Sequence, residues 1–338
     1  MKIDVYRACC IALALVASVA AAGAEPYLAD FPYPYPVSRY EFRSQGQDLW
    51  MSYMDVAPKA ANGRTVVLLH GKNFCGATWE SAISALTAAG YRVIVPDQIG
   101  FCRSAKPRAY QYSLHQLAAS THALLGHLGV DKPIVVGHSM GGMLAIRYAL
   151  MFPDDTSALV LVNPIGLEDW KAKGVPLSTV DELFAKEKQT TAESIKRYQQ
   201  AVYYHGTWRA AYDRWVDMLA SMYTGADGEI VAWSQALTSD MVLSQPVIYE
   251  LERLRVPTLL FIGMKDTTAI GRDKASAEAA KALGNYAKLA PEAAARIKGS
   301  TLIAFPDLGH SPQVEAPERF NAALVERLAA LPPVPSQR

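Results

Sequence analysis

From residue 65 onward, short continuous apolar runs alternate with segments of helical length, and this alternation constrains the fold more than any other feature of the chain. Strands that are apolar on both faces are typical of a parallel sheet covered by helices on each side. The runs are TVVLL (65–69), YRVIVP (91–96), PIVVGH (133–138), SALVLV (157–162), PTLLFIG (257–263) and TLIAF (301–305). A final helix is expected from about Pro317 to Leu331.

Two further strands precede this pattern. SRYEFRSQ and DLWMSYMDVAP alternate in polarity on either side of a glycine turn, which indicates an antiparallel hairpin at a sheet edge. Residues 26–37, rich in proline and aromatic residues, should form an extended arm over the surface. We therefore predict an α/β fold with a doubly wound, mostly parallel eight-stranded sheet.

The alternation is interrupted once, after the sixth strand. Residues 167–255 lack strand signals and are rich in helix formers, so we expect a helical cap there and a core made of residues 25–166 and 256–338. Aromatic residues at helical spacing are more often packing residues than ligand contacts. Because a cap must close over something, we nevertheless expect Tyr204, Trp208 and Trp215 to face a substrate pocket.

The first residues have the layout of a secretory signal. Lys2 and Arg7 precede or flank an apolar run of about 14 residues that ends near Ala22, and an A-x-A pattern follows before Glu25. A membrane span needs about 20 apolar residues, which disfavours the alternative of an uncleaved anchor. We expect residues 1–24 to be removed and the mature protein to be periplasmic or secreted, without membrane insertion.

Charge and composition narrow the class of partner. The formal net charge is +1, and no run of Lys or Arg occurs, which argues against a nucleic-acid-binding surface. No Cys/His cluster has metal-ligand spacing, and no glycine-rich phosphate-binding motif is present, so neither a metal nor a cofactor is expected. The expected partner is a small, largely uncharged molecule, and the oligomeric state stays open.

The hexapeptide GHSMGG at residues 137–142 follows an apolar strand and opens a helix. In that context the G-x-S-x-G pattern predicts a nucleophilic Ser139 on a strained turn, whereas an ordinary N-cap serine is the alternative. Two backbone N–H donors must stabilise the oxyanion of the tetrahedral intermediate. Met140 is the first candidate, and Lys72 or its neighbour Asn73 is the second.

A serine nucleophile needs a base and an acid that orients it. His310 follows the last strand in FPDLGHSPQ, and Asp266 ends the strand PTLLFIGMKD, which gives the chain order serine, acid, histidine. Glu168 or Asp169, after the sixth strand, is the alternative acid. His138 adjoins the nucleophile and is included with Asn73 among the expected pocket residues.

Cys75 and Cys102 are the two cysteines that follow the predicted signal. They lie in loops after the third and fourth strands, which are adjacent in sheets of this kind and open on the same edge. A disulfide is therefore geometrically reasonable, and two buried thiols are the alternative.

Taken together, HGKNFC, DQIGFCRS and GHSMGG make the chain resemble the α/β-hydrolase superfamily, in particular exported bacterial serine hydrolases. The resemblance implies a Ser139–Asp266–His310 triad with Lys72 and Met140 as oxyanion donors. Ser139 excludes the members that need a carboxylate nucleophile. We predict a carboxylic-ester hydrolase, esterase or lactonase, with macrocyclic lactones among its candidate substrates. A perhydrolase, an acyltransferase, a carbon-carbon hydrolase and a non-catalytic ligand sensor are the alternatives.

Overall fold

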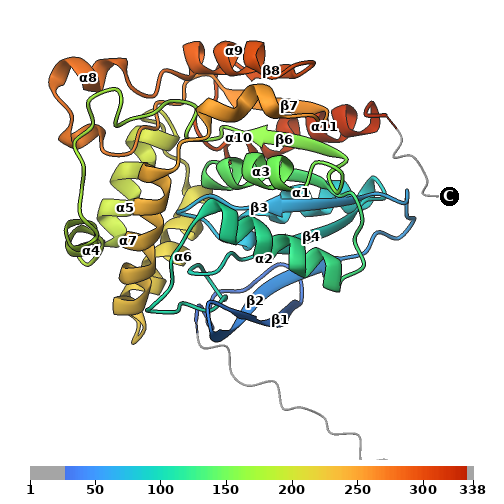
Figure 1. Cartoon of the computed structure of the whole chain (residues 1–338), viewed down its shortest axis with the longest axis horizontal. Coiled ribbons are helices and arrows are strands. Elements are labelled where there is room, and N and C mark those ends of the chain that lie inside the picture. The colour runs from blue at the N-terminus through green and yellow to red at the C-terminus, as the bar shows by residue number, and fades with distance from the viewer. Residues whose placement is uncertain (1–26, 333–338) are drawn as a thin grey trace, which may run out of the picture.

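The computed structural model describes residues 27–332 and confirms the predicted α/β fold (Figure 1). Eight strands form one sheet in the order β1-β2-β4-β3-β5-β6-β7-β8. The first two pairings, β1 with β2 and β2 with β4, are antiparallel, and all later pairings are parallel. The strands are β1 (Val37–Ser44), β2 (Gln47–Val56), β3 (Thr65–Leu69), β4 (Arg92–Pro96), β5 (Ile134–His138), β6 (Ala158–Val162), β7 (Thr258–Gly263) and β8 (Thr301–Phe305).

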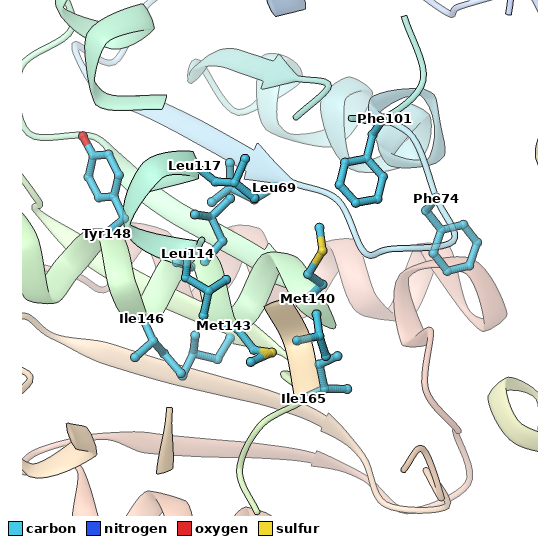
Figure 2. Close-up of a cluster of buried hydrophobic side chains, with 14 of the residues drawn as sticks. Leu69, Phe74, Phe101, Leu114, Leu117, Met140, Met143, Ile146, Tyr148 and Ile165 are labelled. Carbon is cyan, nitrogen blue, oxygen red and sulfur yellow. The ribbon is translucent and has the colours of Figure 1, made fainter. Parts of the chain in front are cut away.

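Alternation along the buried strands divides the core into two layers. In β3, Val66 and Leu68 belong to a cluster with the helices α1 (Glu80–Ala88) and α11 (Pro317–Ala329). Val67 and Leu69 belong to a cluster with α2 (Leu114–His127) and α3 (Met140–Met151). Figure 2 shows Leu69 of the second cluster beside side chains of α2 and α3. Helices therefore cover both faces of the sheet, which explains why its central strands are apolar throughout.

The helices outside the segment between β6 and β7 are, among the described residues, α1 (Glu80–Ala88), α2 (Leu114–His127), α3 (Met140–Met151), α8 (Ala277–Ala282), α9 (Tyr286–Arg296), α10 (Pro312–Glu315) and α11 (Pro317–Ala329). The short helical turns among the described residues are η1 (Gly76–Trp79), η2 (Gln199–Tyr203), η3 (Ala210–Tyr212), η4 (Ile248–Arg253) and η5 (Arg272–Lys274). Of these turns, η2 is a π-helix.

The chain between β6 and β7 folds into α4 (Val180–Glu187), α5 (Ala192–Tyr198), α6 (Asp213–Thr224) and α7 (Gly228–Ser244), which lie together beyond one end of the sheet (Figure 1). Thr179 and Thr191 cap α4 and α5 with reciprocal side-chain to backbone bonds, so the sequence itself marks where both helices begin. We call this group of helices, with the turns that join them, the insertion helices.

The predicted arm is attached to the core. Tyr33 Oη donates to Asp97 Oδ2 at 2.5 Å in the loop after β4, and Phe31 packs against Trp215 of α6. The predicted signal sequence, residues 1–24, lies outside the described residues. Within residues 27–332, no helix is both long and apolar enough to cross a membrane.

Candidate active site

Ser139 occupies a strained turn between β5 and α3. Its φ of 56° and ψ of −119° lie in a region that residues other than glycine rarely adopt. The turn requires small neighbours, because a Cβ at Gly137 would lie 2.0 Å from the Gly141 carbonyl oxygen and one at Gly141 would lie 2.3 Å from that of Leu69. Ser139 is 4% exposed, and the helix that follows it directs the positive end of its dipole toward the serine.

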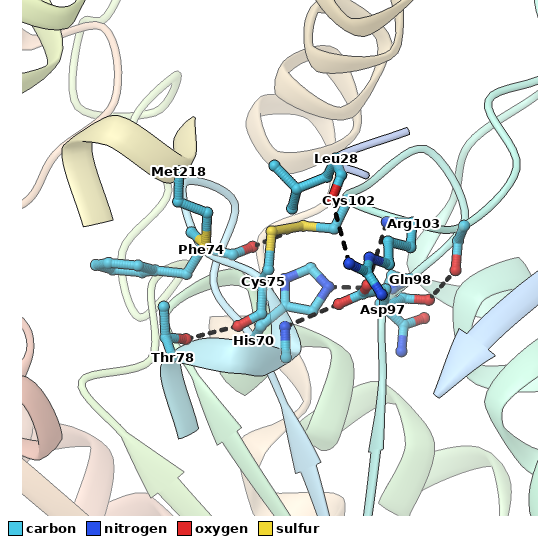
Figure 3. The surroundings of a disulfide bond; sticks show 12 residues. Leu28, His70, Phe74, Cys75, Thr78, Asp97, Gln98, Cys102, Arg103 and Met218 are labelled. Carbon is cyan, nitrogen blue, oxygen red and sulfur yellow. Dashed lines mark hydrogen bonds between the residues drawn. A yellow bond between two sulfur atoms is a disulfide. The ribbon is translucent and has the colours of Figure 1, made fainter. Parts of the chain in front are cut away.

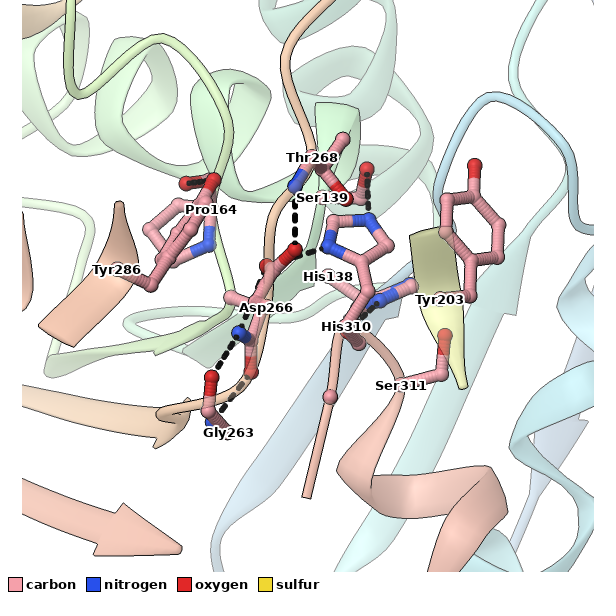
Figure 4. Close-up of polar contacts among 12 residues, drawn as sticks. His138, Ser139, Pro164, Tyr203, Gly263, Asp266, Thr268, Tyr286, His310 and Ser311 are labelled. Atoms are coloured by element: carbon pink, nitrogen blue, oxygen red, sulfur yellow. Dashed lines mark hydrogen bonds and ion pairs between the residues drawn. The ribbon is translucent and has the colours of Figure 1, made fainter. Parts of the chain in front are cut away.

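The three residues of the predicted triad are hydrogen bonded in series (Figure 4). His310 Nε2 lies 2.9 Å from Ser139 Oγ, and His310 Nδ1 lies 2.7 Å from Asp266 Oδ2. A carboxylate can only accept, so Nδ1 carries the proton and Nε2 is left to accept from the serine hydroxyl. His310 and Asp266 are buried, which shields this series from water.

Asp266 receives further hydrogen bonds from two groups that the sequence did not single out. Asn163 Nδ2 donates to Asp266 Oδ2 at 2.9 Å, and the backbone N–H of Thr268 donates to Oδ1 at 2.8 Å. Asn163 lies one residue after β6 and is also bonded to the backbone of Gly263, so it ties the ends of β6 and β7 together. These donors fix the orientation of the carboxylate that faces His310.

The backbone of His310 is held on both sides. Its N–H donates to the carbonyl of Tyr203 at 2.8 Å, and His138 Nε2 donates to its carbonyl at 2.9 Å. Burial, with the nearby His310, lowers the pKa of His138 well below its usual value, so His138 is neutral at pH 7 and can make this bond as a donor. The ring of Tyr203 lies 4.6 Å from that of His310, between centroids.

The two predicted oxyanion donors belong to two segments that meet at the serine. Met140 is the first residue of α3, where N–H groups have no acceptor within the helix. Lys72 follows Gly71, at which a Cβ would come within 3.0 Å of the Ser139 Cβ. The loop after β3 therefore lies directly against the nucleophile, as the motif analysis expects of an oxyanion loop.

Side chains of this loop reach the insertion helices. Lys72 Nζ pairs with Glu187 Oε1 of α4 at 2.9 Å, and Asn73 Nδ2 donates to Tyr203 Oη at 2.9 Å. Glu187 Oε2 also accepts from Tyr223 Oη of α6 at 2.6 Å. Burial raises the pKa of the Glu187 carboxyl, but Lys72 and Tyr223 outweigh burial and hold that pKa below its usual range. A charged and largely buried pair thus joins the loop to α4.

The aromatic residues predicted for the pocket have packing contacts with one another or with the arm. The ring of Tyr204 stacks on Tyr212 with centroids 4.0 Å apart, and Trp208 packs edge-on against both. Trp215 contacts Phe31 and lies beneath the guanidinium of Arg214. Of the predicted pocket residues, His138 is hydrogen bonded to the backbone of His310 and Asn73 to Tyr203 beside it. The pocket roles of Tyr204, Trp208 and Trp215 stay predictions.

Cys75 and Cys102 form a disulfide that joins the loops after β3 and β4 (Figure 3). Asp97 reinforces the junction, because its Oδ1 accepts from the Gly76 N–H at 2.8 Å and its Oδ2 from the Arg103 N–H at 3.2 Å. Asp97 and the two cysteines are also the group of potential metal ligands found among residues 27–332, but both sulfurs are consumed by their mutual bond.

The alternative acid is engaged elsewhere. Glu168 pairs with Lys173 Nζ at 2.6 Å and accepts from the Gly284 N–H at 2.7 Å. Asp169 is hydrogen bonded to Tyr249 Oη at 3.0 Å. Asp266, and neither of these carboxylates, is the one bonded to His310 in the structure.

Several residues around the site were missed by sequence reasoning. Asn163 had a usable signal, since it is a polar residue directly after a continuously apolar strand. Tyr203 and Glu187 had none, because their contacts with the core depend on how the insertion helices fold back over the sheet.

Comparison with known proteins agrees with this fold. The alpha/beta hydrolase fold family matches residues 64–317. A 2-hydroxy-6-oxo-6-phenylhexa-2,4-dienoate hydrolase from Burkholderia cepacia is 32% identical over 141 residues, which cover 41% of this chain and 49% of that protein. A cis-3-alkyl-4-alkyloxetan-2-one decarboxylase from Xanthomonas campestris pv. campestris is 37% identical over 121 residues, which cover 33% of this chain and 39% of that protein. The chain thus matches about half or less of the length of these curated relatives.

A solved structure is more similar over its full length. A probable hydrolytic enzyme from Pseudomonas aeruginosa PAO1 shares 61% identity with a TM-score of 0.88, and the match covers 89% of this chain and 97% of that one. The family match spans most of the chain and includes every strand of the sheet from β3 onward. The protein therefore belongs to the α/β-hydrolase fold family.

Proposed function

We propose that this protein is a serine hydrolase of carboxylic esters, including lactones, that acts through an acyl-enzyme on Ser139. The observation that carries the proposal is the buried series Asp266–His310–Ser139, with both hydrogen bonds at 2.9 Å or less. Such a series lets the imidazole take the serine proton as the hydroxyl attacks a carbonyl carbon.

In the first half of the reaction, Ser139 Oγ forms a bond to the carbonyl carbon and His310 takes its proton at Nε2. The negative charge on the carbonyl oxygen is stabilised by the N–H groups of Met140 and Lys72. His310 then protonates the departing alcohol oxygen as the carbon-oxygen bond breaks. In the second half, water gives a proton to His310 and attacks the acyl carbon. His310 then returns that proton to Ser139 Oγ as the bond between Oγ and the acyl carbon breaks and the acid leaves.

We also propose that the insertion helices, within residues 167–255, act as a cap over this site. Support comes from Tyr203, which contacts His310 through its ring and its carbonyl, and from Glu187, which pairs with Lys72 beside the serine. The cap would bound the space for the acyl and alcohol groups, with Asn73 and the aromatic residues Tyr204, Trp208 and Trp215 as candidates for its lining.

Export of the protein is part of the same proposal. The disulfide Cys75–Cys102 is typical of an oxidising compartment such as the periplasm. The amino-terminal mass of the protein recovered from a periplasmic fraction tests the expected cleavage between Ala24 and Glu25. A mass that includes residues 1–24 would contradict it.

A carbon-carbon bond hydrolase is the second candidate. It is favoured by the curated relative from Burkholderia cepacia, which is a hydrolase of a 2-hydroxy-6-oxo-dienoate. The two candidates share the triad and differ in the bond that breaks.

The first test is treatment with a fluorophosphonate, followed by intact-protein mass spectrometry. The wild-type protein should gain one phosphonyl group, and Ser139→Ala should gain none. A panel of aryl, alkyl and macrocyclic esters, with a 2-hydroxy-6-oxo-dienoate alongside, then separates the candidates. Added peroxide or alcohol would reveal perhydrolysis or acyl transfer. Absence of labelling in the wild type, with tight binding of an ester, would favour a non-catalytic sensor and overturn the proposal.

A further inference from the structure

Glu315 is a buried carboxylate beside His310 that the proposed triad does not use. It ends α10 and is 4% exposed. Its Oε1 accepts from the Gly309 N–H at 2.9 Å and from the Ser311 N–H at 3.3 Å, and its Oε2 lies 3.1 Å from the Gly309 nitrogen. One carboxylate thus binds the backbone on both sides of His310.

The Glu315 contacts complete the hydrogen bonding of this short loop. The N–H groups of Gly309 and Ser311 donate to Glu315, and that of His310 donates to the Tyr203 carbonyl. All three successive amides are therefore held by acceptors outside the loop. The backbone that carries the His310 imidazole can shift only if these bonds change.

The charged groups around Glu315 leave it without a strong cationic partner. His205 Nε2 of the insertion helices is 3.5 Å from Glu315 Oε2. Burial and, to a smaller extent, the positive charge of Lys265 lower the pKa of His205, which disfavours its charged form. Arg209 donates at 2.9 Å to the backbone carbonyl of Glu315 and not to its carboxylate. The other ionisable groups that interact with this carboxylate are Asp266, Tyr204 and Tyr212.

This environment favours the neutral form of the carboxyl group. Burial raises the pKa of Glu315 to about 7, although the amides of Gly309 and Ser311 oppose the rise. The group is therefore protonated well below pH 7 and ionised well above it. Its titration falls in the range where a histidine base also changes charge.

We propose that Glu315 is a positioning residue for His310, and that its negative charge favours the imidazolium formed when Ser139 loses its proton. The inference rests on the proposed function, because it concerns the same base. An ionised carboxylate holds amide N–H groups more strongly than a neutral carboxyl group does. In a water-excluded site, its charge also acts on the imidazolium with little screening.

The proposal has a kinetic consequence. The fully active form has a neutral His310 and an ionised Glu315, so two protons leave as the pH rises toward the optimum. The acid side of the wild-type profile of kcat/KM should then be steeper than a single ionisation allows.

The test compares wild type with Glu315→Gln, Glu315→Ala and the control Asp307→Asn. Glutamine keeps an acceptor oxygen for the two amides but removes the charge. Asp307 is an exposed carboxylate just before the same loop, paired with Arg319, so its replacement removes an equal charge outside the buried site. Hydrolysis of phenyl butanoate and the rate of fluorophosphonate labelling are measured from pH 5 to 9, with thermal unfolding of each variant.

We expect Glu315→Gln to fold and to lower kcat by about tenfold with little change in KM. The acid side of its kcat/KM profile should follow the loss of a single proton. Glu315→Ala should lose more kcat, and Asp307→Asn should follow wild type. If Glu315→Gln has the same kcat as wild type and the same acid side of the kcat/KM profile, the inference is wrong, whatever Glu315→Ala does to folding. If the wild type neither hydrolyses the ester nor reacts with the fluorophosphonate, the proposed function itself fails.

Discussion

His138 and His310 are hydrogen bonded to each other through a ring nitrogen and a backbone carbonyl: Nε2 of His138 lies 2.9 Å from the carbonyl oxygen of His310. The residue that immediately precedes the nucleophile therefore supports the residue that accepts the nucleophile's proton. Since both are buried, the bond is shielded from competing water.

Replacing His138 by leucine should lower kcat by about tenfold, because the buried His310 carbonyl loses its donor and the loop can shift. His138→Gln, whose amide can still donate, should recover part of the loss. The measurement is kcat and KM for an aryl ester at pH 8. Equal activity in the leucine variant and the wild type would show that the loop does not need this bond.

Asn163→Asp should damage activity more than Asn163→Ala, although aspartate is closer to asparagine in shape. Alanine removes a donor from Asp266, which costs about 1 to 3 kcal/mol. Aspartate instead places a second carboxylate 2.9 Å or so from Asp266, where like charges oppose ionisation. The check is kcat for both variants at pH 7, and the reverse order of activities would contradict the assigned role.

Breaking the pair between Lys72 and Glu187 should destabilise the fold. Glu187→Gln leaves a largely buried ammonium without its carboxylate, which typically costs about 3 kcal/mol in the free energy of unfolding. The double variant Lys72→Met with Glu187→Leu should recover most of that loss, because no unpaired charge remains. Denaturant titration measures both, and a double variant no more stable than Glu187→Gln would be contrary to expectation.

Reducing the disulfide should lower stability and activity together. The bond spans a sequence separation of 27, for which chain-entropy estimates give about 3.5 kcal/mol. The same loop carries Lys72 and Asn73, so loosening it should also raise the barrier to acylation. Cys75→Ala with Cys102→Ala, assayed with and without a reductant, gives the check. Reductant should affect only the wild type, and an effect on the double variant would point to some other target.

Stability should depend on pH through Glu315. Its pKa is raised to about 7 from an ordinary value of 4.5, so the folded state holds a proton that the unfolded state releases between those values. That contribution to the free energy of unfolding is fully present below pH 4.5 and is lost as the pH rises through 7. Relative to wild type, Glu315→Gln should therefore be more stable at pH 8 than at pH 5. Equal differences in melting temperature at both values would count against the raised pKa.

The fold was predictable because its signal is local. Each buried strand is recognisable in the sequence as a short apolar run. Ser139 is recognisable as a serine between glycines at the point where a strand ends and a helix begins. His310 and Asp266 each follow such a strand, and the structure brings all three together. The third and fourth strands are neighbours in sheets of this kind, so the loops that carry Cys75 and Cys102 were expected to lie close together. The disulfide was therefore foreseeable, with two buried thiols as the alternative.

What escaped prediction depends on contacts between distant segments. Lys72 and Glu187 are 115 residues apart, and nothing in either neighbourhood reveals the other. The direction of Tyr204 toward Tyr212 likewise depends on how the helices after β6 pack, since helical periodicity does not tell a packing face from a ligand-facing one.

The carbonyl of Tyr203 has a consequence for the way such enzymes can be recombined. It accepts the His310 N–H, and it lies so close to Gly309 that a Cβ there would be 2.1 Å from its oxygen. The helices between β6 and β7 therefore supply part of the support for the base. A chimera that exchanges these helices with those of another hydrolase would exchange that support too, so altered turnover in it would not by itself report a new substrate preference.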